Sequence, residues 1–160
     1  MEKGRNLCFT GLIILLVVVF SSCTSDDVVT DEEQLAIDIE IIDTYLSDNS
    51  IDATSVASGL RYFLHEEGEG ISPELTDDVV VAYSGKLLGE TQVFDSSDSI
   101  SFPLNRLIAG WQIGFQLLQE GDSATLYIPS GLAYGSTGSG PIPPNANLEF
   151  EVKLIQVVKN

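Results

Sequence analysis

Apolar and polar residues alternate along several short stretches in the second half of the chain. The alternation is clear at 60–64 and 79–83, and it returns at 125–128 and at 149–158, which is rich in β-branched residues. A period of two residues puts successive side chains on opposite faces of an extended strand. The glycines of Gly68–Gly70 break the first run. The pattern therefore predicts a set of short β-strands.

A different period occurs at 107–118, where apolar residues recur at steps of three and four: Ile108, Trp111, Phe115 and Leu118. This spacing predicts one amphipathic helix among the strands. A single helix that covers the apolar face of an antiparallel sheet is an α+β fold. Proline and glycine cluster in the connections, most densely at 135–144, and these loops are therefore expected to have defined shapes.

A second helix is predicted near the N-terminus, from about Asp31 to Ser47. Thr30 and Glu33 have the spacing of a capping box, and Asp48–Ser50 is typical of a helix end. One face is apolar: Leu35, Ile39, Ile42 and Leu46, with Ile41 and Tyr45 beside it. This face is expected to pack on the protein's own domain, and the alternative is an arm that pairs two copies.

The first residues have the pattern of an export signal. Lys3 and Arg5 precede an apolar run that, from Leu7 to Phe20, has 14 residues, whereas a membrane-spanning helix needs about 20. Phe20-Ser21-Ser22-Cys23 resembles a bacterial lipobox, in which small residues precede a cysteine that is acylated after cleavage. We expect Cys23 to be the lipidation site, and the alternative is an ordinary thiol beyond a secretory cleavage site.

Three segments follow from these patterns. Residues 1–22 are expected to be a lipoprotein signal peptide, 23–56 an acidic tether with the short helix, and 57–160 the folded domain. Ser25–Asp27 is either a solvated linker or, by its resemblance to an acidic export signal, an address for the cell surface. Acyl chains on Cys23 give stable attachment to a bilayer when more than one is present.

Composition narrows the function classes. The 160 residues include 7 Lys and Arg against 24 Asp and Glu, a net charge of −17, which disfavours nucleic acid as a partner. No spacing matches a calcium loop, and no glycine-rich segment leads into a helix that starts with Lys and Ser or Thr. The sequence therefore predicts neither a metal site nor a cofactor.

Five short motifs carry a more specific signal. In chain order they are Val81-Ala-Tyr83-Ser-Gly85, Val93-Phe94-Asp95-Ser96-Ser97, Leu107-Ile108-Ala-Gly110-Trp111, Ala133-Tyr134-Gly135 and Ile142-Pro143-Pro144-Asn-Ala-Asn-Leu148-Glu-Phe150. Their order and spacing resemble those of the FKBP family, the peptidyl-prolyl cis-trans isomerases that bind macrolide immunosuppressants. The resemblance covers about 60–160, and it implies an antiparallel sheet wrapped around one short helix.

The resemblance also implies a set of site residues. It assigns catalysis to Tyr83, Phe94, Asp95, Ile108, Trp111, Tyr134 and Phe150, and substrate binding to Leu107 and Ile142. In this assignment Trp111 forms the floor of the pocket, Tyr83 orients Asp95, and the Ile108 N–H and the Tyr134 hydroxyl donate to the substrate. The alternative is that the aromatic residues are only core. Asp95, Tyr83 and Tyr134 place polar groups among them, which favours a ligand pocket.

The implied activity is acceleration of X–Pro isomerisation in exported or envelope proteins, at a lipid-anchored position in the outer membrane. Partners implied by the resemblance are proline-containing polypeptides and macrolides. The alternatives are a prolyl-peptide-binding chaperone without turnover, and a protein whose acidic surface serves only solubility or adhesion. Two departures from the family pattern stand out: Pro141 replaces a branched apolar residue, and no arginine follows Asp95 to pair with it.

Overall fold

A computed structural model describes residues 29–160. Two α-helices, six strands and three short 3-10 helices follow one another: α1 (Asp31–Asp48), β1 (Thr54–Ser55), β2 (Arg61–Glu66), β3 (Asp78–Leu87), β4 (Val93–Pro103), η1 (Leu104–Arg106), α2 (Ala109–Gln116), β5 (Ser123–Ile128), η2 (Ser130–Leu132), η3 (Gly135–Thr137) and β6 (Leu148–Val158). In this part of the chain no helix is both long enough and apolar enough to span a bilayer.

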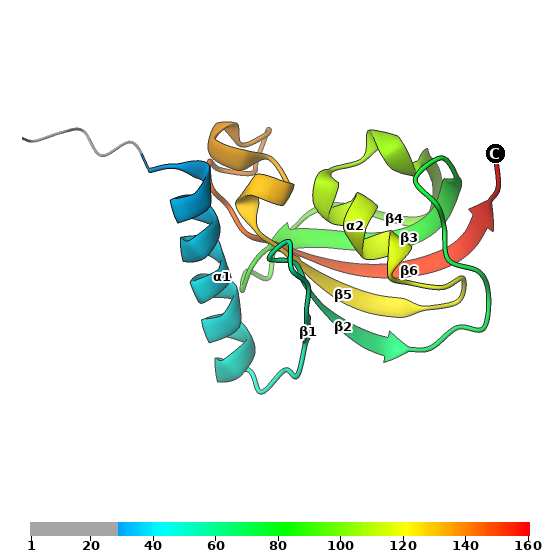
Figure 1. Cartoon of the computed structure of the whole chain (residues 1–160), viewed down its shortest axis with the longest axis horizontal. Coiled ribbons are helices and arrows are strands. Elements are labelled where there is room, and N and C mark those ends of the chain that lie inside the picture. Colours follow the sequence, from blue (N-terminus) through cyan, green and yellow to red (C-terminus); the bar gives the residue numbers. More distant parts are fainter. Residues whose placement is uncertain (1–28) are drawn as a thin grey trace, which may run out of the picture.

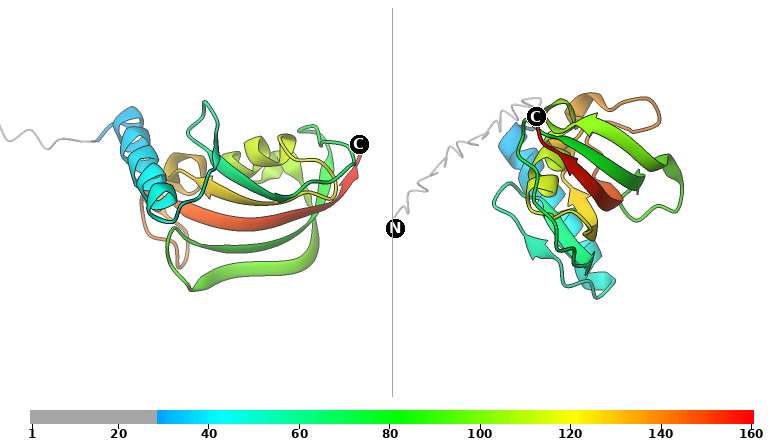
Figure 2. Two further views of the ribbon diagram at one scale, coloured as in Figure 1. Left: turned by 90° about the horizontal axis from the view of Figure 1, so that it is seen from below. Right: turned by 90° about the vertical axis from the view of Figure 1, so that its right-hand side faces the viewer.

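The six strands form one sheet in the order β1-β2-β5-β6-β3-β4, and every neighbouring pair is antiparallel. The sheet is curved, and α2 lies against one of its faces (Figures 1 and 2). The predicted α+β class, with an antiparallel sheet around one short helix and a further helix before it, is confirmed.

Close packing of α2 on the sheet depends on two small residues one helical turn apart. A Cβ added at Gly114 would lie 2.8 Å from Leu126 Cδ1, and one added at Gly110 would collide with Ile128. Trp111 and Phe115 lie beside these glycines in the helix and are 5% and 0% exposed. The helix therefore sits directly on β5 and turns its two aromatic side chains into the core.

Helix α2 is shorter than the predicted 107–118. Ile108 is its N-cap residue, with extended backbone (φ −58°, ψ 149°), and Leu117 is its C-cap. Leu107 and Ile108 therefore precede the helix. The Ile108 carbonyl accepts from the Trp111 and Gln112 amides, whereas the Ile108 N–H lies before the helical hydrogen-bond ladder, which matters for the site described below.

Strand β4 was not predicted, because most of its residues are polar and exposed. It pairs only with β3 and forms an edge of the sheet. Polar, charged side chains are a common feature of edge strands, where they discourage pairing with other chains. Of its apolar residues, Phe94 and Phe102 are half-buried and pack against the main core.

Helix α1 begins and ends as predicted, with both hydrogen bonds of the Thr30–Glu33 capping box in place and Asn49 as C-cap. It packs on the end of the sheet away from the C-terminus (Figure 1), where Ile42 and Leu46 form a small core with Tyr127 of β5. Packing on its own domain is thus confirmed. Ile41, predicted at the edge of the buried face, is 49% exposed, whereas Asp38 is fully buried.

Candidate active site

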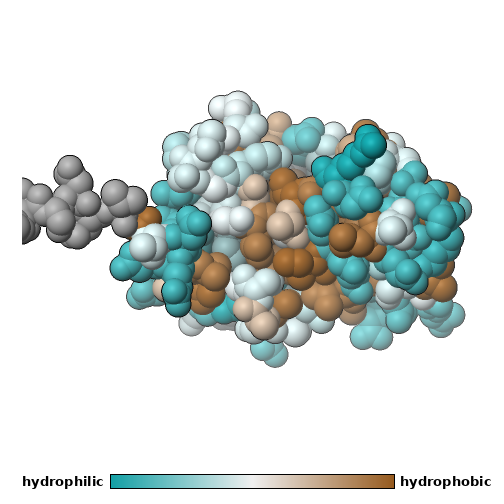
Figure 3. Space-filling model, turned by 45° about the horizontal axis from the view of Figure 1, so that its top comes forward, coloured by the Kyte–Doolittle hydropathy of each residue, from teal (hydrophilic) through white to brown (hydrophobic). Residues whose placement is uncertain are grey.

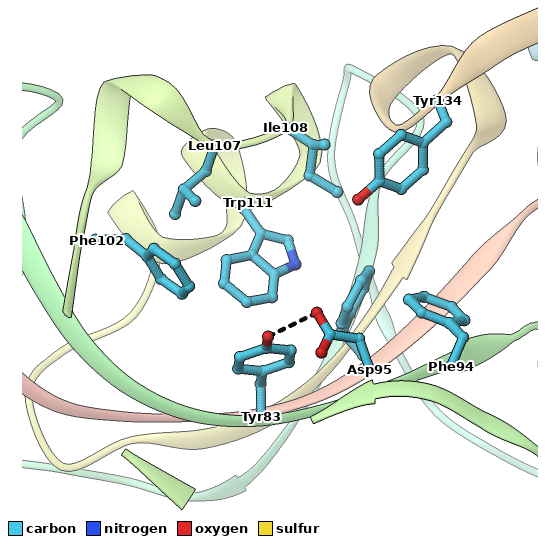
Figure 4. A pocket seen from close by; sticks show the side chains of 9 residues that line it. Tyr83, Phe94, Asp95, Phe102, Leu107, Ile108, Trp111 and Tyr134 are labelled. Carbon is cyan, nitrogen blue, oxygen red and sulfur yellow. Dashed lines mark hydrogen bonds between the residues drawn. The ribbon is translucent and has the colours of Figure 1, made fainter. Parts of the chain in front are cut away.

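A pocket of about 160 Å3 lies between α2, the strands β3, β4 and β6, and the segment that follows η2. Nine residues line it: Tyr83, Phe94, Asp95, Phe102, Leu107, Ile108, Trp111, Tyr134 and Phe150. They come from β3, β4, β6, α2 and two connecting segments (Figure 4). Six of the nine are aromatic. The hydropathy of the surface shows a hydrophobic area in the middle of one face, with hydrophilic margins on both sides (Figure 3).

Trp111 is the centre of the aromatic lining. Its ring centroid lies 5.1 Å from those of Tyr83 and Phe150, and the ring planes meet at 80° and 83°. Phe102 lies 6.2 Å away, also edge to face. Such edge-to-face pairs are worth about 0.5–1.5 kcal/mol each beyond the area they bury. The pocket floor is therefore held in shape by the protein itself.

The sheet register explains how the polar pair Tyr83 and Asp95 meets. Gly85 of β3 is paired with Asp95 of β4 on one side and with Phe150 of β6 on the other, and Tyr83 is two residues before Gly85. Side chains two residues apart on paired strands share a face. The Tyr83 hydroxyl donates to Asp95 Oδ2 over 2.7 Å (Figure 4).

Tyr83 keeps its proton over a wide pH range. Burial, followed by the hydrogen bond to Asp95 and the negative charge there, raises the pKa of Tyr83 to about 12. The pKa of Tyr134 is raised as well, first by burial and then by the charge of Asp95. Both hydroxyl groups are therefore donors near neutral pH, and within 29–160 no cationic side chain forms an ion pair with Asp95.

Among the N–H groups of the pocket residues, the Ile108 amide and the Trp111 indole lack an acceptor among residues 29–160. The amide of Ile108 makes no hydrogen bond, because its residue precedes the first turn of α2. The indole Nε1 of Trp111 is buried without a partner. Gln112 fixes the first of these groups, since its Nε2 donates to the Leu107 carbonyl over 2.7 Å. The Leu107 carbonyl and the Ile108 N–H belong to one planar trans peptide, in which they point in opposite directions. The bond to Gln112 therefore also fixes the direction of the N–H.

Eight of the nine residues assigned from the sequence lie in this pocket. The exception is Ile142, which is 6% exposed, belongs to the main core and does not line the pocket; its role in substrate binding has no support from this geometry. Phe102 lines the pocket and was not predicted, because it lies in β4 beyond the motif of Val93–Ser97 that located Phe94 and Asp95. The sequence gives little indication that Phe102 belongs to a site, because it is a single aromatic residue between Pro103 and a segment rich in serine.

An apolar pocket with a few hydrogen-bond donors is typical of a protein that binds a compact apolar group of a ligand. Residues 69–155 match the family model for FKBP-type peptidyl-prolyl cis-trans isomerases. The chain belongs to this family, and the resemblance noted in the sequence is confirmed.

Three relatives illustrate the similarity. The chain is 49% identical over 108 residues to a probable FKBP-type peptidyl-prolyl cis-trans isomerase FkpA of Neisseria meningitidis; the match covers 64% of this chain and 39% of that protein. It is 35% identical over 159 residues to the macrophage infectivity potentiator of Trypanosoma cruzi, covering 94% and 81%. A crystal structure of a peptidyl-prolyl cis-trans isomerase from Pseudomonas syringae has a TM-score of 0.68 at 30% identity, covering 78% of this chain and 96% of that one.

Proposed function

We propose that the protein catalyses cis-trans isomerisation of X–Pro peptide bonds in exported or envelope polypeptides, with the prolyl segment bound in the aromatic pocket. The observation that carries this proposal is the pocket floor, where Trp111 meets the rings of Tyr83, Phe102 and Phe150 edge to face. The family of the chain supports the reaction type. The chain spans only 39% of the length of the Neisseria relative, so its own activity, clients and partners are proposed here.

The chemistry requires no bond to break. Rotation about a peptide bond has a barrier of about 18–20 kcal/mol, because amide resonance is lost when the bond twists. The planar amide carries the charge separation of that resonance, and the twisted amide carries less. An apolar pocket that excludes water therefore favours the twisted state over the planar one. A thousandfold acceleration needs about 4 kcal/mol of such differential stabilisation.

The polar groups of the pocket hold the substrate chain on either side of the twisting bond. The Ile108 N–H has no acceptor among residues 29–160 and donates to a substrate carbonyl. The Tyr134 hydroxyl points into the pocket (Figure 4) and donates a second hydrogen bond. The hydrogen bond from the Tyr83 hydroxyl holds the Asp95 carboxylate at the rim of the pocket. Leu107 also lines the pocket, and in this proposal its side chain contacts the proline ring.

Activity on a proline-containing tetrapeptide tests the proposal. We expect the protein to speed the appearance of the trans form, and Phe94→Ala and Asp95→Ala to reduce the rate strongly. A macrolide should compete with the peptide for the pocket. Binding of peptide and macrolide without any acceleration would instead assign the pocket to a non-catalytic chaperone module, and would refute the isomerase proposal.

We further propose that the mature protein is a lipoprotein of the cell envelope, attached to the outer membrane through Cys23. Support comes from the basic, apolar and small-residue pattern of residues 1–22, followed by the acidic stretch of 24–33. Residues 1–22 and Cys23 lie outside the described part of the chain. Metabolic labelling with a fatty acid tests the site: Cys23→Ser should abolish labelling and release the protein from the membrane fraction, whereas Cys8→Ser should change neither.

A further inference from the structure

Helix α1 carries a carboxyl group that is fully buried. Asp38 is 0% exposed, and it receives three hydrogen bonds. Gln34 Nε2 donates to its Oδ1 over 2.8 Å, and the Ser130 amide and hydroxyl donate to its Oδ2 over 2.8 and 2.6 Å. No basic side chain within 29–160 pairs with it. A buried carboxyl group is tolerated only where such donors replace water.

The network around Asp38 joins segments that are far apart in the sequence. Ser130 is 1% exposed, and its amide is shared with Asn147 Oδ1 at 3.1 Å. Asn147 Nδ2 in turn lies 3.5 Å from the Asp38 carbonyl. The result is a closed ring of buried polar groups between α1, the start of η2 and the residue before β6. Fully satisfied networks of this kind fix one arrangement of the segments that they join.

The segment held by this ring leads directly to the pocket. Ser130 begins η2, where Leu132 N donates to the Pro129 carbonyl at 2.9 Å and Ala133 N donates to the Ser130 carbonyl at 3.0 Å. Tyr134 is the next residue, and its ring lines the pocket. Its hydroxyl makes no hydrogen bond to any described residue, so the backbone on its two sides sets where the ring lies. After Tyr134, the Gly138 amide donates to the Tyr134 carbonyl over 3.2 Å. Before it, the backbone is η2, which is anchored at Ser130.

We propose that Asp38 is a positioning residue of the active site: through Ser130 and η2 it holds Tyr134 where the phenol reaches the bound prolyl segment. Helix α1 is then part of the catalytic unit, although it lies outside the residues that match the family model. The inference rests on the role proposed above for Tyr134.

A double-mutant cycle in the full chain tests this coupling. Tyr134→Phe removes the donor and should reduce kcat/KM for the tetrapeptide about two- to tenfold, the range for one hydrogen bond. Asp38→Ala should give a loss of similar size, since it lets Tyr134 move. The double variant should be no slower than Tyr134→Phe alone, because a displaced phenylalanine has no hydroxyl to misplace. Rates are compared at a temperature where circular dichroism shows every variant folded.

Three further variants separate positioning from general support of the fold. Asp43→Ala removes the ion pair with Arg61 (2.8 Å), which ties the same helix to β2 instead of η2; it should lower Tm and leave kcat/KM unchanged. Asp38→Asn retains an acceptor for Ser130 and should recover most of the activity lost in Asp38→Ala. Ser130→Ala removes only the hydroxyl contact and provides a milder test if Asp38→Ala does not fold.

Multiplicative losses in the double variant would overturn the inference, as would full activity in folded Asp38→Ala, or in Ser130→Ala where the first variant does not fold. Unchanged activity in Tyr134→Phe would also overturn it, since the coupled donor would have no role. In that case the isomerase activity measured for the unmodified chain would still stand. The cycle thus distinguishes a failure of this inference from a failure of the proposed function.

Discussion

Gly85 is the position at which a single methyl group should damage the pocket most. It lies in β3 between Asp95 and Phe150, and the absence of a side chain lets two pocket rings meet over it. A Cβ at this position would collide with Phe150 Cε1 and would lie 2.9 Å from its Cδ1 and 3.0 Å from Phe94 Cε2. Gly85→Ala therefore forces both rings to move.

The size of the effect follows from these distances. Ordinary contact begins at 3.4 Å, so Phe150 Cδ1 has to withdraw by at least 0.5 Å, and Cε1 by more. Phe150 is 3% exposed, has Trp111 and Phe94 as ring neighbours and lines the pocket, so its displacement changes the shape of the pocket. Overpacking of this kind costs about 1–3 kcal/mol in stability. If about 1.4 kcal/mol of transition-state stabilisation is lost with it, kcat/KM falls tenfold.

The measurement is a protease-coupled assay in which only the trans tetrapeptide is cleaved, combined with thermal unfolding. Gly85→Ala should lower kcat/KM at least tenfold and lower Tm by several degrees. Gly131→Ala is the matched control, because no atom lies within 4 Å of the added Cβ and the backbone is outside the left-handed region. It should leave activity unchanged and stability equal or slightly higher. Wild-type activity and Tm in Gly85→Ala would refute the packing argument.

Two other predictions concern hydrogen bonding and pH. Gln112→Met removes the donor that fixes the Leu107 carbonyl and should raise KM for the tetrapeptide about two- to tenfold; Gln116→Met, which removes a similar bond to the Gln112 carbonyl, should not. Burial is the first cause that raises the pKa of both Tyr83 and Tyr127 to about 12, against about 10 when unfolded. The stability that they contribute is therefore complete below pH 10 and is lost as the pH rises to 12, which urea unfolding at pH 9, 10 and 11 will measure. An unchanged urea midpoint over this range would contradict the second prediction.

The parts of the fold that were predictable from the sequence are those where one face is buried. In β6, Val152 and Leu154 are buried while Glu151 and Lys153 are exposed, so the alternation in the sequence reports the structure directly. Strand β4 has no such pattern because it lies at an edge and is mostly solvated. Its position is set by pairing with β3, and this long-range effect leaves little trace in local periodicity.

The site divides in a similar way. The family motifs located eight of the nine residues that line the pocket. They missed Phe102, and they assigned Ile142, which belongs to the core and does not line the pocket. They gave no indication of the groups that hold those residues. Asp38, on the buried side of a helix read as apolar, is recognisable only once Ser130 is seen beside it, 92 residues away in the chain. Local sequence patterns carry no record of such a pairing, because each partner alone resembles an ordinary surface residue.

The ring geometry also explains why this pocket requires no general acid or base. Trp111 contacts rings that come from β3, β4 and β6, and Phe115 of its own helix packs behind it at 5.2 Å. A cavity built in this way keeps its shape when empty, so little binding energy is spent on ordering it. The reaction changes only the planarity and polarity of one amide, and a rigid apolar surface discriminates between those two states. Catalysis therefore depends on the positions of the pocket side chains. For this reason a methyl group at Gly85, which displaces two of the rings, should lower kcat/KM more than the loss of a charge on the surface away from the pocket.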